Sequence, residues 1–288
     1  MNLAFVKMHG IGNDFVFIDN RSRELDLGSE QIRLLADRRR GIGCDQLLMV
    51  EPASDSHSDV RARIFNQDGS EVGQCGNGLR CLAAYLRDTG IATGEQITIQ
   101  AGQGSVRARL TDGTADGSAD GSPDGSLIAV DMGVPRFAPR DIPFLAETEA
   151  DSYTVRVGSR ELEIGAVSMG NPHGVLRVDD CESTPVEVLG PAVQAIEEFP
   201  EGVNVGFMQI VDDGRVRLRV FERGVGETQA CGSGACAAVA VGRRSGWLGP
   251  RVSVMLTGGE LTVDWDGEGR SMWLTGPTQR AFEGRFEL

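Results

Sequence analysis

The chain has 288 residues, 40% hydrophobic and 24% charged, which is typical of a soluble globular protein large enough for two domains. Its net charge of −14 argues against a nucleic-acid partner, and the one tight basic cluster, Arg38-Arg39-Arg40, is typical of a solvated helix end. No stretch approaches the ~18 apolar residues of a membrane helix, and no secretory leader is apparent. We therefore expect a cytoplasmic protein without membrane association, whose six cysteines stay reduced.

In chain order, the first half predicts two strands and then a glycine-rich turn that opens a helix. Asn13 precedes a short strand in "GNDFVFID" (12–19), and "RARIF" (61–65) alternates polar and apolar residues like a half-buried strand. The turn "CGNG" begins at Cys75 and leads into "LRCLAAYLRDTG" (79–90), an apolar helical stretch closed by a glycine. A β-rich segment, "ITIQAGQGSVRARL" (97–110), follows.

A segment of different composition comes next, "TDGTADGSADGSPDGS" (111–126), with an Asp-Gly pair every four residues. A calcium-binding β-helical repeat would need an apolar position to bury, so the pattern favours a flexible insertion. We place a domain boundary after it, between Asp131 and Pro139.

The second half repeats the first at an offset of 156 residues. The turn "CGSG" begins at Cys231, "RLRVF" (217–221) falls on the earlier strand, and "ACAAVAVGRRSG" (235–246) falls on the earlier helix. The segment "GNPHGVLRVD" (170–179) echoes the first asparagine and strand, and "VSVMLTGGELTVDW" (252–265) echoes the later β-rich segment. The matches predict a duplicated α+β unit, with strands around one apolar helix in each half.

The predicted halves are 1–131 together with 277–288, and 132–276. The C-terminal "RAFEGRF" (280–286) alternates like a strand and is assigned to the first half. Two similar halves would bring both cysteine turns to one cleft, a favoured location for a small-molecule site.

Each cysteine turn combines a thiol with the start of a helix. The free N–H groups and dipole of a first helical turn favour negative charge, and they are expected to lower the pKa of a thiol there. Glycine lets the backbone approach a ligand closely. Each turn can therefore hold an anion and present a base.

Other uses of these cysteines fit less well. Zinc sites favour Cys-x2-Cys, whereas Cys75 and Cys231 are followed by Cys81 and Cys236 at longer spacings, which are expected to be core residues. A Cys-x-x-Cys redox pair, a phosphate-binding loop and a convincing dinucleotide-binding loop are absent from the sequence. A pair of thiols acting as acid and base on opposite faces of one carbon remains, and it needs neither metal nor cofactor.

The chain resembles the diaminopimelate epimerase family. The resemblance rests on "KMHGIGNDFVFID" (7–19), "DRRRGIGCDQLL" (37–48), "FNQDGSEVGQCGNGLRC" (65–81), "GNPH" (170–173), "GVNVGF" (202–207) and "FERGVGETQACGSGAC" (221–236). It implies an α+β fold of two pseudo-symmetric domains, each a strongly curved, mostly antiparallel sheet around a central helix. It also implies cofactor-independent epimerisation of diaminopimelate and a homodimer.

The resemblance also implies the site residues. Cys75 and Cys231 would be the two bases, with His173 and Glu222 near the thiols to assist deprotonation. A buried Arg223 would bind a carboxylate of the substrate, and Glu222 an ammonium. The implied substrate-binding residues are Asn13, Gln46, Asn66, Gly76, Asn77, Asn171, Asn204, Glu222, Arg223, Gly232 and Ser233.

Two other functions are compatible with the sequence. A proline or hydroxyproline racemase would use the same paired turns, but Glu222-Arg223 and the set of amides favour a longer zwitterionic substrate. A non-enzymatic amino-acid binder could use the helix starts, but binding alone does not need two thiols.

Overall fold

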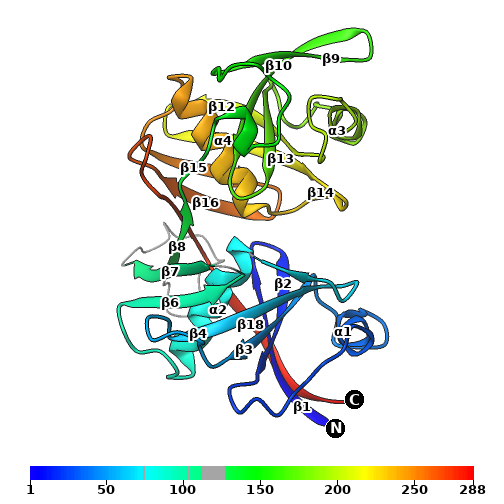
Figure 1. Ribbon diagram of the computed structural model, residues 1–288, viewed down its shortest axis with the longest axis vertical. Coiled ribbons are helices and arrows are strands. Elements are labelled where there is room, and N and C mark those ends of the chain that lie inside the picture. Colours follow the sequence, from blue (N-terminus) through cyan, green and yellow to red (C-terminus); the bar gives the residue numbers. More distant parts are fainter. Residues whose placement is uncertain (74, 103, 112–126) are drawn as a thin grey trace. The chain divides into compact units, whose positions relative to one another are not determined.

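The computed structural model describes residues 1–73, 75–102, 104–111 and 127–288 (Figure 1). It divides into unit 1, Met1–Asp131 with Thr275–Leu288, and unit 2, Met132–Leu274. The predicted insertion 111–126 lies outside the described residues except for Thr111. Among the residues described, none of the helices has the length and apolar character to cross a membrane.

Unit 1 is a curved sheet whose strands follow the order β18-β1-β2-β3-β4-β6-β7-β8, with the short β5 also paired to β4. The β2–β3 and β4–β6 pairs are parallel and the others antiparallel. The elements are β1 (Asn2–Gly10), β2 (Asn13–Asp19), α1 (Ser29–Ala36), β3 (Gln46–Glu51), β4 (Val60–Asn66), β5 (Glu71–Val72), α2 (Gly76–Asp88), β6 (Gln96–Ala101), β7 (Gly104–Thr111), β8 (Leu127–Gly133) and β18 (Gln279–Glu287).

Unit 2 repeats this order as β9-β10-β11-β12-β13-β15-β16, with β14 beside β13. The parallel pairs, β11–β12 and β13–β15, fall at the same places as in unit 1. The elements are a 3₁₀ turn (Pro139–Asp141), β9 (Tyr153–Val157), β10 (Arg160–Ser168), β11 (Pro172–Arg177), α3 (Val186–Gln194), β12 (Asn204–Asp212), β13 (Arg215–Glu222), β14 (Gly226–Thr228), α4 (Gly232–Arg244), β15 (Arg251–Leu256), β16 (Gly259–Asp264) and β17 (Met272–Gly276).

The edge strand next to the first strand of each repeat has a different origin in the two units. In unit 2 it is β9, which precedes β10 directly, whereas in unit 1 it is β18, from the far end of the chain. The alternating C-terminal sequence thus pairs with β1 over nearly its whole length.

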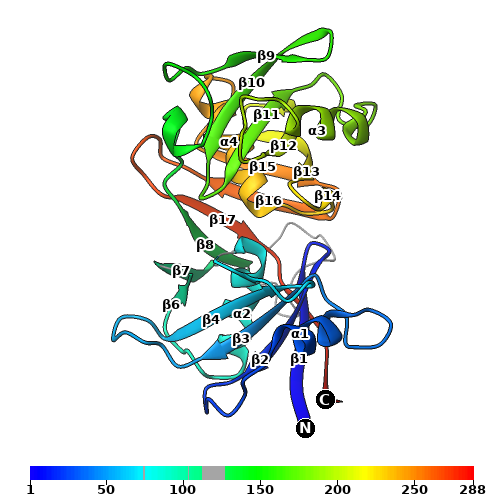
Figure 2. The same ribbon diagram turned by 45° about the vertical axis from the view of Figure 1, so that its right-hand side comes forward.

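One helix lies against the strands of each sheet, α2 in unit 1 and α4 in unit 2 (Figures 1 and 2). Both are buried over most of their length, and the side chains of α4 are mostly small, so the strands of unit 2 approach it closely. A Cβ at Gly165 of β10, for example, would lie 2.3 Å from Val241 Cγ1 of α4. Each helix is followed by a glycine at positive φ, Gly90 at 69° and Gly246 at 74°, because this conformation closes the C-terminus.

The opposite face of each sheet is covered too, by α1 in unit 1 and α3 in unit 2. Strand β2 shows the consequence. Val16 and Ile18 belong to the core cluster under α1, while Phe17 stacks on Tyr85 of α2 with ring centroids 5.6 Å apart. A strand with both faces covered has a nearly continuous apolar sequence, and β2 contains such a run, "FVFI".

An ion pair is also duplicated. Arg63 of β4 binds Glu71 of β5 with an N–O distance of 2.9 Å, and at the same offset Arg219 of β13 binds Glu227 of β14 at 2.6 Å. Each pair joins the long strand to the short strand that leads to the cysteine turn. The predicted correspondence of the two halves therefore extends to side-chain contacts.

Candidate active site

Each cysteine turn is the N-terminus of a buried helix. Cys75 and Cys231 are the N-cap residues of α2 and α4, with φ/ψ of −148°/108° and −120°/105°. Cys75 Sγ accepts a hydrogen bond from the Gly78 amide at 3.4 Å, so the sulfur takes the place of a capping oxygen. A Cβ at Gly78 or Gly234 would lie 3.4 or 3.2 Å from the sulfur of its turn, which leaves little room for a larger residue.

In unit 1 the predicted amides gather at the edge of the sheet from which α2 starts. Asn13 begins β2, Gln46 begins β3 and Asn66 ends β4; Gln46 and Asn66 are paired in register, and Gln46 Nε2 donates to Asn66 Oδ1 at 2.9 Å. Asn77, in the turn itself, donates to Asn13 Oδ1 at 3.4 Å. Gln46 Oε1 is buried and accepts no hydrogen bond within the described parts of the chain, so it can accept one from a ligand.

Unit 2 places its predicted residues at the corresponding edge. His173 lies in β11 opposite Asn204, the first residue of β12, and Glu222 ends β13. Asn204 Oδ1 accepts the Arg223 amide at 2.9 Å, and Asn204 Nδ2 donates to the Pro172 carbonyl at 3.3 Å. Gln46 and Asn66 of unit 1 thus correspond to Asn204 and Glu222 of unit 2.

Cys231 lies in a more acidic and more enclosed setting than the helix start alone predicts. It is 5% exposed, its thiol contacts Ser233 Oγ at 3.7 Å, and the Glu222 carboxylate lies close enough to act on the thiol through its charge. Burial and the charge of Glu222 raise the pKa of the Cys231 thiol well above its usual value, although Ser233 and the Gly234 amide act in the opposite direction. The expectation of a lowered pKa is therefore wrong for Cys231, because burial outweighs the helix start.

His173 is also buried, at 1% exposure. Burial, and to a lesser degree the charge of Arg223, lower the pKa of His173 to about 3, so the ring is neutral at pH 7. Its Nε2 lies 3.0 Å from Asn171 Oδ1, and because a carbonyl oxygen only accepts, Nε2 carries the proton. His173 is thus a neutral hydrogen-bonding group in unit 2.

The expectation of a buried Arg223 is wrong. The residue is exposed, and its Nη1 donates to the Glu201 carbonyl at 2.5 Å. Strand β13 ends at Glu222, so Arg223 falls in the turn to β14, where its side chain reaches solvent. Cys81 and Cys236 are fully buried core residues, as predicted.

Three residues next to the site were missed by the sequence reasoning. Asp45 accepts from Asn13 at 2.8 Å, Arg80 donates to Asn77 at 2.8 Å, and Arg38 binds Asp45 at 2.7 Å. For Arg38 the sequence predicts only a solvated helix end. Only their places in the sequence could have indicated a role in the site: Asp45 comes directly before Gln46, and Arg80 lies two residues after the Cys75 turn.

Comparison with known proteins gives the family. The model of the diaminopimelate epimerase family matches residues 5–137 and 165–281. The chain belongs to this family. Over all of both chains it is 50% identical to the diaminopimelate epimerase of Chromobacterium violaceum. Over 99% of this chain and 96% of the relative, it is 51% identical to that of Halorhodospira halophila. The relatives are isomerases by name, and the matches span both cysteine turns.

Solved structures at lower identity share the fold. A hydroxyproline epimerase from Agrobacterium vitis matches 99% of this chain and 92% of its own with a TM-score of 0.68 and 18% identity. A phenazine biosynthesis protein of the PhzF family from Bacillus anthracis matches all of both chains with a TM-score of 0.70 and 17% identity. The two-unit α+β fold predicted from the sequence is the fold of this group.

Proposed function

We propose that the protein interconverts LL- and meso-diaminopimelate by moving a proton at the α-carbon between two thiols, without a cofactor. Each predicted half, 1–131 with 277–288 and 132–276, supplies one thiol. The observation that carries the proposal is the repeated cysteine N-cap at the start of a buried helix, in a chain of this family.

The proton balance is simple. In one direction the Cys75 thiolate removes the α-hydrogen as a proton, and the Cys231 thiol delivers its proton to the opposite face of the carbon. The products are a Cys75 thiol, a Cys231 thiolate and the inverted carbon; the reverse direction exchanges the roles. The α-carboxylate takes up the negative charge that develops, and the backbones of Gly76, Asn77, Gly232 and Ser233 at the two helix starts bind it.

The setting of Cys231 supports its role as the acid. Its raised pKa keeps the thiol protonated before reaction, so a proton is available for delivery. The reverse direction starts from the Cys231 thiolate that this delivery leaves, and the neighbouring Glu222 is proposed to assist proton exchange between Cys231 and solvent. Thr228 Oγ1 donates to Glu222 Oε1 at 2.5 Å, which fixes this carboxylate. His173, neutral and bonded to Asn171, assists as a hydrogen-bonding group rather than as a cation.

The amides support recognition of a long zwitterion. Asn13, Gln46, Asn66, Asn171 and Asn204 present donors and acceptors that a wrong stereoisomer would leave unpaired. Gln46 Oε1 is suited to an ammonium hydrogen because it is buried without an acceptor role in the described chain. Arg223 is proposed to bind the distal carboxylate, which requires it to exchange its contact with the Glu201 carbonyl for the ligand.

The test is incubation with LL-diaminopimelate in D₂O, with deuterium at the α-carbon and the meso product followed together. We expect exchange and epimerisation in the reduced protein, and loss of epimerisation by at least about a thousandfold in Cys75→Ala and in Cys231→Ala. No exchange with folded, reduced protein would refute the proposal, and full activity in either variant would refute the two-base mechanism. L-Proline and hydroxyproline, run in parallel, test the alternative of a racemase for cyclic substrates.

We also propose the cellular compartment, the oligomeric state and the biosynthetic role of the protein. Family membership supports a cytoplasmic homodimer that supplies meso-diaminopimelate for lysine and peptidoglycan precursor synthesis. A molecular mass near twice 30.8 kDa in size-exclusion chromatography with light scattering is the expected result. A monomer that retains full activity would contradict this part.

A further inference from the structure

We propose that Asp45 and Arg80 are positioning residues that together fix which way the amides of Asn13 and Asn77 point. The inference rests on the proposed function, because these two amides belong to the site that binds the reacting end of the substrate. Neither positioning residue is expected to touch the substrate itself.

A chain of hydrogen bonds connects the two ends. Arg80 Nη1 donates to Asn77 Oδ1 at 2.8 Å, Asn77 Nδ2 donates to Asn13 Oδ1 at 3.4 Å, and Asn13 Nδ2 donates to Asp45 Oδ2 at 2.8 Å. An amide alone can be turned over, since its oxygen and nitrogen exchange places at little steric cost. Here the guanidinium can only donate and the carboxylate can only accept, so both amides have a single allowed orientation.

The two ends are held firmly. Arg80 is completely buried on α2, and a Cβ at Gly10 would lie 2.8 Å from its Nη2, so the guanidinium is enclosed by the strands. Asp45, at the other end, accepts from the Asp14 amide at 3.1 Å through the same oxygen that accepts from Asn13. Its second oxygen, Oδ1, accepts from Arg38 Nη2 at 2.7 Å.

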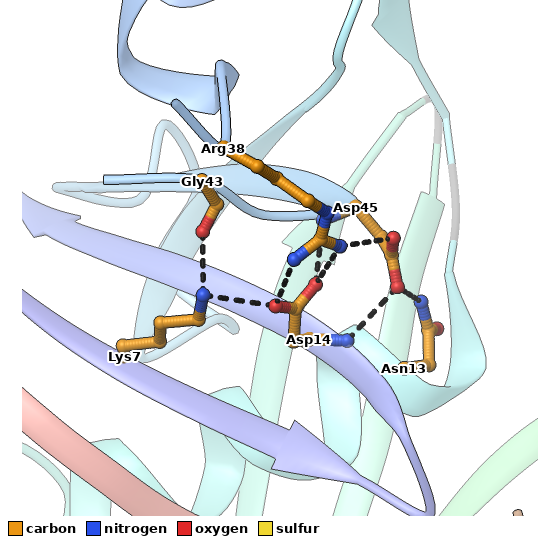
Figure 3. A network of polar contacts seen from close by, with 6 residues as sticks. All are labelled: Lys7, Asn13, Asp14, Arg38, Gly43 and Asp45. Atoms are coloured by element: carbon orange, nitrogen blue, oxygen red, sulfur yellow. Dashed lines mark hydrogen bonds and ion pairs between the residues drawn. The ribbon is translucent and has the colours of Figure 1, made fainter. Parts of the chain in front are cut away.

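Figure 3 shows how the Asp45 end is braced. Arg38 binds both oxygens of Asp14, at 2.8 and 2.7 Å, and Lys7 bridges Asp14 at 2.9 Å and the Gly43 carbonyl at 2.6 Å. Burial opposes ionisation of Asp14, but the bonds from Arg38 and Lys7 outweigh it and hold the pKa of Asp14 well below its usual value. The guanidinium of Arg38 is therefore fixed by a carboxylate that stays ionised, and it in turn orients Asp45.

As a consequence, the positions of the amide donors and acceptors in the site are fixed. With Asn13 Nδ2 and Asn77 Oδ1 occupied, Asn13 offers its oxygen and Asn77 its nitrogen to each other and to the ligand. Asn77 also follows Gly76 directly in the Cys75 turn, so the bond from Arg80 secures the backbone that binds the α-carboxylate. An error of about 1 Å in such a group costs ~100-fold in rate.

The decisive variant is Asp45→Asn. The new amide has two possible orientations. If its NH₂ turns toward Arg38, it meets the guanidinium, which is also a donor. If its NH₂ turns toward Asn13, it meets the donors of the Asn13 side chain and of the Asp14 backbone. Because Arg38 is held by Asp14, we expect the second arrangement, which forces Asn13 to turn over against Asn77. We expect kcat/KM with diaminopimelate to fall about tenfold to a hundredfold. The side chain of Asp45 is 36% exposed, so the fold should survive, and thermal unfolding checks this.

The second variant distinguishes positioning from simple damage. In Arg38→Met/Asp45→Asn the new amide can keep its oxygen toward Asn13 and turn its NH₂ to solvent. We therefore expect the double variant to be at least threefold more active than Asp45→Asn, although Arg38→Met alone lowers activity slightly. Loss of structure alone would make the double variant worse.

Asp19→Asn is the matched control, because Asp19 is likewise a part-exposed carboxylate bound by an arginine, Arg21, at the other end of β2. It should keep wild-type kcat/KM. The inference is overturned if Asp45→Asn stays within twofold of wild type, or if the double variant is no more active than Asp45→Asn. An inactive wild-type protein would instead refute the proposed function.

Discussion

Replacing Gly234 with alanine should slow the enzyme more than it destabilises it. A Cβ there would lie 3.0 Å from Val220 Cγ2 and 3.2 Å from Cys231 Sγ, so the thiol must move by a few tenths of an ångström. Overpacking costs about 1–3 kcal/mol, and the better helix propensity of alanine returns about 1 kcal/mol. The net loss of unfolding free energy is therefore about 0–2 kcal/mol.

The expected catalytic effect follows from the same displacement. If 1 Å costs ~100-fold, a few tenths of an ångström cost about fourfold to tenfold in kcat/KM. Gly242→Ala is the matched control on the same helix, about 12 Å farther along. Its Cβ would lie 2.4 Å from Leu248 Cδ1, so it should lose more stability but keep kcat/KM within about twofold. Calorimetry and epimerisation assays on both variants test this, and equal catalytic losses would refute the reasoning.

Three further outcomes follow from the charges of the two units. Glu222→Gln removes a charge that raises the pKa of Cys231. The pH midpoint for alkylation of Cys231 by iodoacetamide, followed by mass spectrometry, should therefore move to lower pH. An unchanged midpoint would contradict an effect of Glu222 on this thiol. The pKa of His173 is about 3 in the folded protein against 6.5 as its ordinary value, so the unfolded state binds the extra proton between these limits. Folding stability should therefore fall by about 1.4 kcal/mol per pH unit below pH 6.5, and His173→Asn should lessen this slope in urea titrations. Arg219→Met should lower the unfolding midpoint more than Arg63→Met, because Arg219 also donates to two carbonyls, at 2.8 and 3.0 Å; the reverse order would contradict this.

The sequence predicts those strands and helix ends that have a local residue pattern. The alternation in "RARIF" and "RLRVF" gives β4 and β13, and the glycines after the two apolar stretches mark the ends of α2 and α4. The parallel β2–β3 and β4–β6 pairs have no such local sign, because they join segments separated by other elements. The family resemblance implies only that each sheet is mostly antiparallel, so it does not specify these pairs.

The electrostatic details were the least predictable. The pKa of Cys231 depends on burial by the folded sheet and on Glu222, nine residues away, so the helix start alone gave the wrong direction. Arg38 looked like a solvated basic residue, and its side chain is indeed 52% exposed, yet it braces two carboxylates from different segments. A charge run shows where charges are, whereas their partners depend on the tertiary fold.

The origin of the edge strand β18 has a consequence for synthesis of the protein. Unit 2 is one continuous stretch, Met132–Leu274, and the synthesis of all its strands is finished before unit 1 has its full set. Unit 1 has to wait for β18, which pairs with β1 from the opposite end of the chain. The half that carries Cys75 is thus the last to have all of its strands, because it is closed by the final segment of the chain. An arrested chain that ends before β18 would contain both thiols without a finished enzyme.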